Sequence, residues 1–73
     1  MIKILHIDNS TSEQRIDKFL KRQFISLSQS FIEKNLRKKN ILVNNKPTKS
    51  KYMLKTNDLV NIENYSEKVY QYF

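Results

Sequence analysis

Apolar and polar residues alternate at the start of the chain, and this period of two predicts a short strand over residues 1–7. One face of the strand would carry Ile2, Ile4 and His6. The other face would carry Lys3, Leu5 and Ile7. Residues 8–12 are polar and typical of a turn, so the first strand is expected to end before them.

Two segments with a helical period follow. The first predicts a helix over residues 13–24 with Thr11 or Ser12 as its N-cap, because Thr11 and Gln14 have the spacing of a capping box. Its apolar stripe consists of Ile16, Phe19, Leu20 and Phe24. The second helix is expected to start at Ser28, with Ser30 and Glu33 as an alternative capping box, and to end near residues 39–40. Its buried side would consist of Phe31, Ile32 and Leu36.

The period then returns to two. Strands are predicted over residues 41–44 and 59–63, with a turn at 45–47, an extended piece at 52–54 and a turn at 56–58 between them. The sequence therefore indicates an α+β fold in which two packed helices are followed by a small, mostly antiparallel sheet, with a short N-terminal strand. We expect one domain over residues 1–63 and a C-terminal tail over residues 64–73 that shows no clear period.

The chain has no glycine and no cysteine. Turns that need a positive φ must therefore use another residue, and asparagine is the least costly, so Asn40, Asn45 and Asn57 are expected at bends. Without cysteine there is no disulfide or thiolate metal site, which fits a cytoplasmic protein. No apolar run approaches the roughly 18 residues of a membrane span, so we expect no membrane partner.

The positive charge lies in the middle of the chain. Residues 25–55 carry eight Lys or Arg and the single acid Glu33, a sum of +7, whereas residues 1–24 sum to +2 and residues 56–73 to −2. Within this block, Ser30, Lys34, Arg37 and Lys38 fall on the helix face opposite the buried side. A basic helix face that continues into a basic strand-turn-strand segment favours a polyanion as partner, although most charge runs are only solvated surface.

Four motifs in order resemble those of the S-four (alpha-L motif) RNA-binding domain. They are Arg15-Ile16-Asp17 with Phe19-Leu20, Ser28-Gln29-Ser30, Val43-Asn44-Asn45, and Asn57-Asp58-Leu59-Val60. The resemblance covers residues 14–62. Within that superfamily, the first motif together with Leu36-Arg37-Lys38 looks most like the N-terminal domain of ribosomal large-subunit pseudouridine synthase C, where this domain is an RNA-targeting module ahead of a catalytic domain.

The resemblance implies a surface that binds structured RNA, with large-subunit ribosomal RNA as the expected partner of a monomer. The residues expected to contact it are Arg15, Ser28, Gln29, Ser30, Lys34, Arg37, Lys38, Lys39, Asn44, Lys46, Lys49 and Lys51. Lys and Arg would neutralise phosphates. Ser28 and Ser30 are interpreted first as caps, Asn44 first as a hairpin residue, and Arg15 equally as a packing or a binding residue.

Two departures from the family pattern affect this surface. Gln29 stands where the family usually has Arg or Lys, which removes one expected phosphate contact. Lys39, Asn45 and Asn57 stand where the family usually has glycine. The two asparagines can adopt the required backbone, but for Lys39 we expect Asn40 to take the left-handed position in its place.

The residues show no catalytic apparatus, metal site or cofactor site. The one histidine, His6, has no obvious acidic partner, and the aspartate of Arg15-Ile16-Asp17 belongs to the helix motif and not to the catalytic Arg-Leu-Asp segment of pseudouridine synthases. The tail after residue 63 is interpreted as the start of a linker to a catalytic domain that these residues lack, or as a frayed end. The alternatives to a targeting module are a free-standing, ribosome-associated S-four protein and a DNA-binding winged helix.

Overall fold

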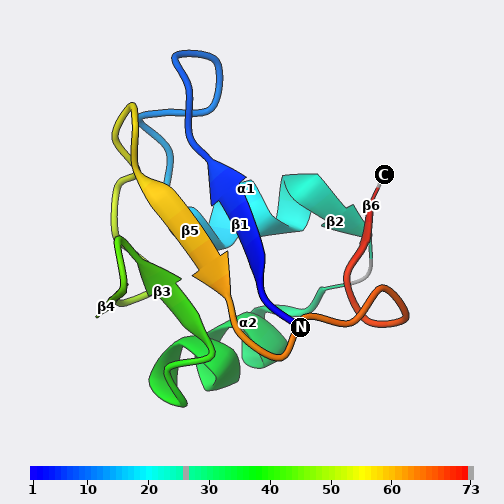
Figure 1. Cartoon of the computed structure of the whole chain (residues 1–73). Coiled ribbons are helices and arrows are strands. Elements are labelled where there is room, and N and C mark those ends of the chain that lie inside the picture. Colours follow the sequence, from blue (N-terminus) through cyan, green and yellow to red (C-terminus); the bar gives the residue numbers. More distant parts are fainter. Residues whose placement is uncertain (26, 73) are drawn as a thin grey trace.

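An antiparallel sheet with strand order β1-β5-β3-β4 lies beside two helices (Figure 1). The computed structural model describes residues 1–25 and 27–72, and in this part of the chain the sheet consists of β1 Lys3–His6, β5 Leu59–Ile62, β3 Ile41–Val43 and β4 Lys46–Pro47. The helices are α1 Ile16–Gln23 and α2 Gln29–Arg37. A second pair of strands, β2 Phe24–Ile25 and β6 Gln71–Tyr72, is also antiparallel. The α+β prediction is confirmed.

The predicted apolar faces meet in one core. Ile16, Leu20, Phe24 and Ile32 are fully buried, and they pack with Ile7 and the inner residues of β3 and β5. The N-terminal strand has the expected two faces, because Ile2 and Ile4 are exposed while Ile7 is buried. The helical stripes and the strand alternation were therefore reliable guides to the interior.

The first helix begins later than predicted. Residues 13–15 lie outside the helix because this segment pairs with residues 52–54: Arg15 and Met53 form a β-bridge, the Glu13 amide donates to the Leu54 carbonyl over 2.7 Å, and Glu13 has φ 60°. Neither Thr11 nor Ser12 is the N-cap, which is Arg15 without a side-chain cap. The predicted end was also too late, since Phe24 leaves the helix and pairs with Tyr72 in β2–β6.

The second helix is capped at Ser28, whose Oγ accepts from the Phe31 amide over 3.0 Å. At the other end Lys39, and not Asn40, takes the left-handed conformation, with φ 64°. The Lys39 amide donates to the Leu36 carbonyl and the Asn40 amide to the Asn35 carbonyl, which are the two bonds of a Schellman motif. The expectation for Asn40 was wrong because this bonding pattern requires the left-handed residue directly after the C-cap, Lys38.

The β3–β4 hairpin turns one residue earlier than predicted. Asn44 and Asn45 form the two-residue loop with φ 52° and 64°, while Lys46 and Pro47 already pair with β3. Positive φ at both loop residues is the signature of a type I′ turn, which suits the twist of paired strands. Asn57, with φ 75°, bends as predicted.

The segment after β5 packs onto the rest of the chain. Tyr65 and Tyr70 are buried, their rings are stacked at 5.4 Å, and β6 pairs with β2. Phe73, the last aromatic residue of the expected tail, lies outside the described residues. The division of the chain after residue 63 stays a prediction.

Candidate nucleic-acid interface

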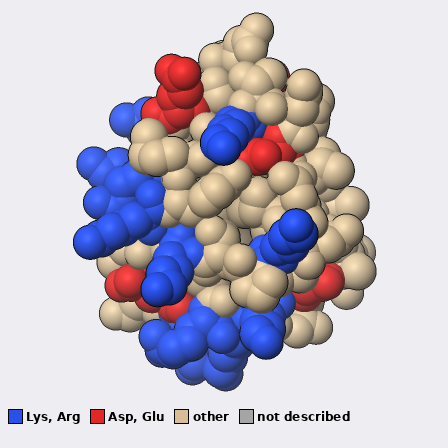
Figure 2. Space-filling view, turned by 90° about the vertical axis from the view of Figure 1, so that its left-hand side faces the viewer, with Lys and Arg blue, Asp and Glu red and all other residues tan. Residues whose placement is uncertain are grey.

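The basic residues of the middle block come from two elements. Lys34, Arg37, Lys38 and Lys39 belong to α2 and its C-terminal end, and all four are exposed. Lys46, Lys49 and Lys51, also exposed, lie in β4 and the segment that follows it. Figure 2 looks onto the side of the molecule that carries β3 and β4, where Lys and Arg gather in several groups along the left and the bottom of the view, with few acidic residues among them.

A hollow of ≈ 720 Å³ lies between α2 and residues 47–51. The cations that line it are Arg37, Lys39, Lys49 and Lys51. Leu36 and Pro47 supply apolar wall, and Glu33 and Ser50 supply polar groups. The fold thus brings together cations from the C-terminal end of α2 and from a loop ten or more positions further along the sequence, as the basic pattern suggested.

A second hollow of ≈ 350 Å³ shares Pro47 and Thr48 with the first. Lys46, Asn44 and Tyr52 also line it. Lys46 of the β3–β4 hairpin therefore lies next to the larger hollow. Ser28, Ser30, Lys34 and Lys38 do not line either hollow, so the structure splits the predicted set into a central group and residues elsewhere on the surface.

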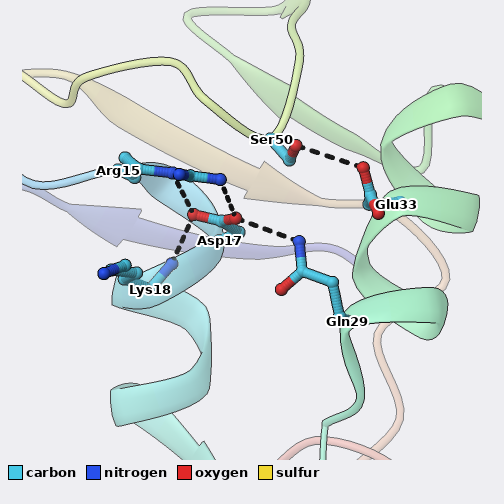
Figure 3. Close-up of polar contacts among 6 residues, drawn as sticks. All are labelled: Arg15, Asp17, Lys18, Gln29, Glu33 and Ser50. Carbon is cyan, nitrogen blue, oxygen red and sulfur yellow. Dashed lines mark hydrogen bonds and ion pairs between the residues drawn. The ribbon is translucent and has the colours of Figure 1, made fainter.

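The loop with Lys49 and Lys51 is held from both helices. The first amides of α1 are engaged by this loop, because Ile16 donates to the Tyr52 carbonyl over 2.9 Å and Asp17 to the Ser50 carbonyl over 3.4 Å. From the other side, Ser50 Oγ donates to Glu33 Oε1 of α2 over 3.2 Å (Figure 3). These contacts place the loop cations opposite the α2 cations before any ligand binds.

The carboxylate of Asp17 joins the starts of both helices (Figure 3). It accepts two hydrogen bonds from the Arg15 guanidinium at 3.1 and 2.8 Å, one from the Lys18 amide and one from Gln29 Nε2 at 3.0 Å. Burial raises the pKa of Asp17, but the hydrogen bonds from Gln29, Arg15 and the Lys18 amide outweigh it, so the net pKa lies below the ordinary value. Arg15 and Gln29, both predicted to contact RNA, are thus engaged within the protein.

Asp58 ties the hairpin to the loop before β5. Its carboxylate accepts from Asn44 Nδ2 at 3.0 Å, from the Tyr52 hydroxyl at 2.8 Å and from the Lys55 amide at 2.9 Å. Asn44 Oδ1 also accepts from the Leu59 amide, so both ends of its amide are used structurally, as first interpreted. Burial raises the pKa of Asp58, but the hydrogen bonds from Lys55, Tyr52 and Asn44 bring the net pKa below the ordinary value.

Sequence reasoning missed Glu33 and Ser50 as parts of this surface. The available signal for Glu33 was that it is the one acid in the basic block of residues 25–55. No signal identified Ser50, because its contact with Glu33 joins residues 17 positions apart. In the part of the chain that the structure describes, no group of three or more His, Cys, Asp or Glu residues could hold a metal ion. None of the described helices has the length and apolar character needed to cross a membrane.

Comparisons with known proteins agree with this architecture. The family model of the S4 domain matches residues 14–60. The chain is 39% identical over 61 residues to "Ribosomal large subunit pseudouridine synthase C" of Vibrio parahaemolyticus and 34% identical to the protein of the same name from Vibrio cholerae. The corresponding protein of Buchnera aphidicola is 36% identical over the same length.

These alignments cover 84% of this chain but only 19% of each relative. The chain therefore spans about a fifth of the length of the curated relatives it matches. No solved structure gives a significant match.

Proposed function

The chain belongs to the S4 domain family, a family of RNA-binding domains, and we propose that its basic surface docks structured ribosomal RNA of the large subunit. Lys and Arg would neutralise phosphates along the RNA backbone and so recognise shape more than sequence. Arg37 is suited to a bidentate phosphate contact, whereas the lysines act as point charges.

One observation carries this proposal: four cations from two separate elements line one hollow. In the described part of the chain the single ion pair joins Arg15 to Asp17, so none of these four cations forms an ion pair with an acid. Lysines that are merely solvated have no reason to surround one hollow together with cations of another element. The hydrogen bonds of Ser50 and of the Asp17 amide hold the loop in place, which also supports the proposal.

We further propose that this domain targets a large-subunit ribosomal RNA pseudouridine synthase to its substrate. The support is that the relatives named as such synthases match this chain over its S4 region. Those relatives are much longer than the matched region, which makes up 19% of their length. On this proposal the chain acts as a monomer in the cytoplasm, and isomerisation of uridine would belong to a separate catalytic domain after the tail that begins at residue 64. A free-standing, ribosome-associated protein would use the same surface.

The winged-helix interpretation does not agree with membership in the S4 family. That DNA-binding fold uses the N-terminal part of its recognition helix, which here is Ser28 to Phe31 and carries no cation. The cations instead gather at the C-terminal end of α2.

A pair of double variants tests the proposal. Arg37→Ala/Lys49→Ala removes one cation from each side of the hollow, and we expect affinity for a structured fragment of large-subunit ribosomal RNA to fall about tenfold or more. The control, Lys21→Ala/Lys68→Ala, makes the same change in net charge in the last turn of α1 and in the segment before β6, which lie across the molecule from the β3–β4 hairpin (Figure 1). Equal losses of affinity in the two double variants would refute a localised RNA site.

A further inference from the structure

Glu33 occupies an unexpected place in the cation-lined hollow. Among the described residues that line it, Glu33 is the only acid, and it faces a surface that carries Arg37, Lys39, Lys49 and Lys51. Its carboxylate forms no ion pair with any of them, since the one ion pair of the described residues is that of Arg15 and Asp17. The Glu33 side chain is exposed.

The carboxylate has free acceptor capacity. Ser50 Oγ donates to Glu33 Oε1 over 3.2 Å, and this is the one hydrogen bond that the Glu33 side chain makes in the described structure (Figure 3). An ionised carboxylate offers about four acceptor sites on its two oxygens and can accept two parallel N–H donors. The Ser50 carbonyl also accepts from the Asp17 amide of α1, so the residue that orients the Glu33 carboxylate is itself held by α1.

A carboxylate in this position disfavours a phosphate directly beside it, because like charges repel. The phosphates would lie at the surrounding cations, and Glu33 would face a group that donates hydrogen bonds. In RNA the donors are base N–H groups and 2′-hydroxyls. Guanine is the base whose Watson–Crick edge places two N–H donors, N1–H and the N2 amino group, side by side. Adenine and cytosine place an acceptor nitrogen beside their amino group, and uracil flanks its one N–H with two carbonyls.

From these contacts we infer that the hollow takes an unpaired guanine base, with Glu33 accepting from guanine N1–H and the N2 amino group. The inference rests on the proposed RNA-binding function and adds a base preference to it. The hollow's ≈ 720 Å³ lies within the range of about 300–1,000 Å³ of small-molecule sites, and Leu36 and Pro47 provide apolar surface for the face of the base. The base must be unpaired, since pairing would occupy the edge that Glu33 contacts.

The test measures binding of fluorescently labelled RNA hairpins by anisotropy. Their loops consist of uridine, with guanosine, inosine or adenosine placed at one loop position at a time. Inosine keeps N1–H but lacks the N2 amino group, and adenosine lacks both donors. At the best-binding position we expect the order guanosine, inosine, adenosine, with about fivefold or more between the first and the last.

Glu33→Gln keeps an acceptor for Ser50 but removes the second carboxylate oxygen, and we expect it to reduce the guanosine preference to less than about twofold. The matched control is Glu67→Gln, which changes the net charge equally at an exposed acid outside the hollow and is expected to keep the preference. Circular dichroism verifies that both variants are folded.

Two results would overturn the inference. One is equal affinity of the wild type for all three hairpins, and the other is a guanosine preference that survives Glu33→Gln. If in either case the RNAs still bind with a steep dependence on salt, the RNA-binding function stands and only the guanine site is refuted. Failure of the wild type to bind any of the hairpins or structured ribosomal RNA at low salt would refute both.

Discussion

Gln29 Nε2 donates a hydrogen bond of 3.0 Å to Oδ2 of Asp17 and so links the start of α2 to the start of α1 (Figure 3). Gln29 stands between two serines, where the motifs of the S4 family usually have a cation. In this chain the position joins the two helices, because its side chain is directed to the carboxylate of Asp17, a residue that is only 2% exposed. Two loop lysines, Lys49 and Lys51, lie opposite the C-terminal end of α2 across the hollow.

Substitution of Gln29 is expected to affect stability more than RNA binding. Gln29→Ala removes one hydrogen bond to a buried carboxylate, so the free energy of unfolding should fall by about 1 to 2 kcal/mol, as urea denaturation would measure. RNA affinity should change less than about twofold, because the contact is internal to the protein. The control is Ser30→Ala at an exposed neighbour, with an expected change within about 0.5 kcal/mol. Unchanged stability with a large loss of RNA affinity would identify Gln29 as an RNA ligand instead.

Glycine should have opposite effects at two adjacent lysines. Lys39 has φ 64°, where a residue with a Cβ is strained, so Lys39→Gly is expected to raise the free energy of unfolding by about 1 kcal/mol. Lys38 is right-handed, with φ −77°, so Lys38→Gly should lower it by about 0.5–1 kcal/mol. Both variants lose one positive charge, so charge cannot explain a difference in sign. Destabilisation by both substitutions would contradict the left-handed helix end at Lys39.

Stability should fall in acid because of Asp17 and Asp58. Both carboxyl groups have a pKa below the ordinary value of 3.8, so the unfolded chain takes up protons at a higher pH than the folded chain does. Their contribution to stability is therefore complete above about pH 5 and is lost as pH falls from about 4 through the folded-state pKa values. Thermal unfolding midpoints should be level from about pH 7 to 5 and then decline, with a shallower decline in Asp17→Asn. A decline that is equally steep in Asp17→Asn would refute the role of this carboxylate.

The segment after β5 should contribute to the core. The Tyr70 ring, 3% exposed, contacts the Phe24 ring at 5.2 Å and the Phe31 ring at 5.7 Å between centroids. Tyr70→Ala is therefore expected to cost about 3 kcal/mol of unfolding free energy, measured in urea. The exposed neighbour Val69 serves as control, and Val69→Ala should cost less than about 0.5 kcal/mol. A cost for Tyr70→Ala as small as for Val69→Ala would mean that this segment does not stabilise the domain.

Local sequence patterns predicted most of the fold, and contacts between distant residues explain the errors. The apolar stripes identified both helices, and the second helix has its N-cap at Ser28, as expected, because this cap is local. The first helix was predicted too long because residues 13–15 pair with residues 52–54, which no helical period indicates. The β2–β6 pair was missed for a similar reason, since Phe24 continues the helical stripe but pairs with Tyr72.

The candidate RNA-binding surface was likewise predictable only in part. Charge along the chain identified the cations, and the helical period placed Arg37 on an exposed face. The pattern could not show that Arg15 and Gln29 turn to Asp17, nor that Ser50 and Glu33 meet, because each of these arrangements depends on how the two helices and the loop pack. The hydrogen bonds that hold the basic surface in its shape can therefore be identified only from the tertiary structure.

The salt dependence of RNA binding tests the central claim most directly. If the surface neutralises about five phosphates, log affinity for structured large-subunit ribosomal RNA should fall linearly with log salt concentration, with a slope of roughly −3.5 to −4.5. Arg37→Ala/Lys49→Ala should make the slope shallower by roughly 1.4 to 1.8, because two phosphate contacts are lost. An affinity that does not depend on salt, or tighter binding to duplex DNA than to structured RNA, would contradict the account.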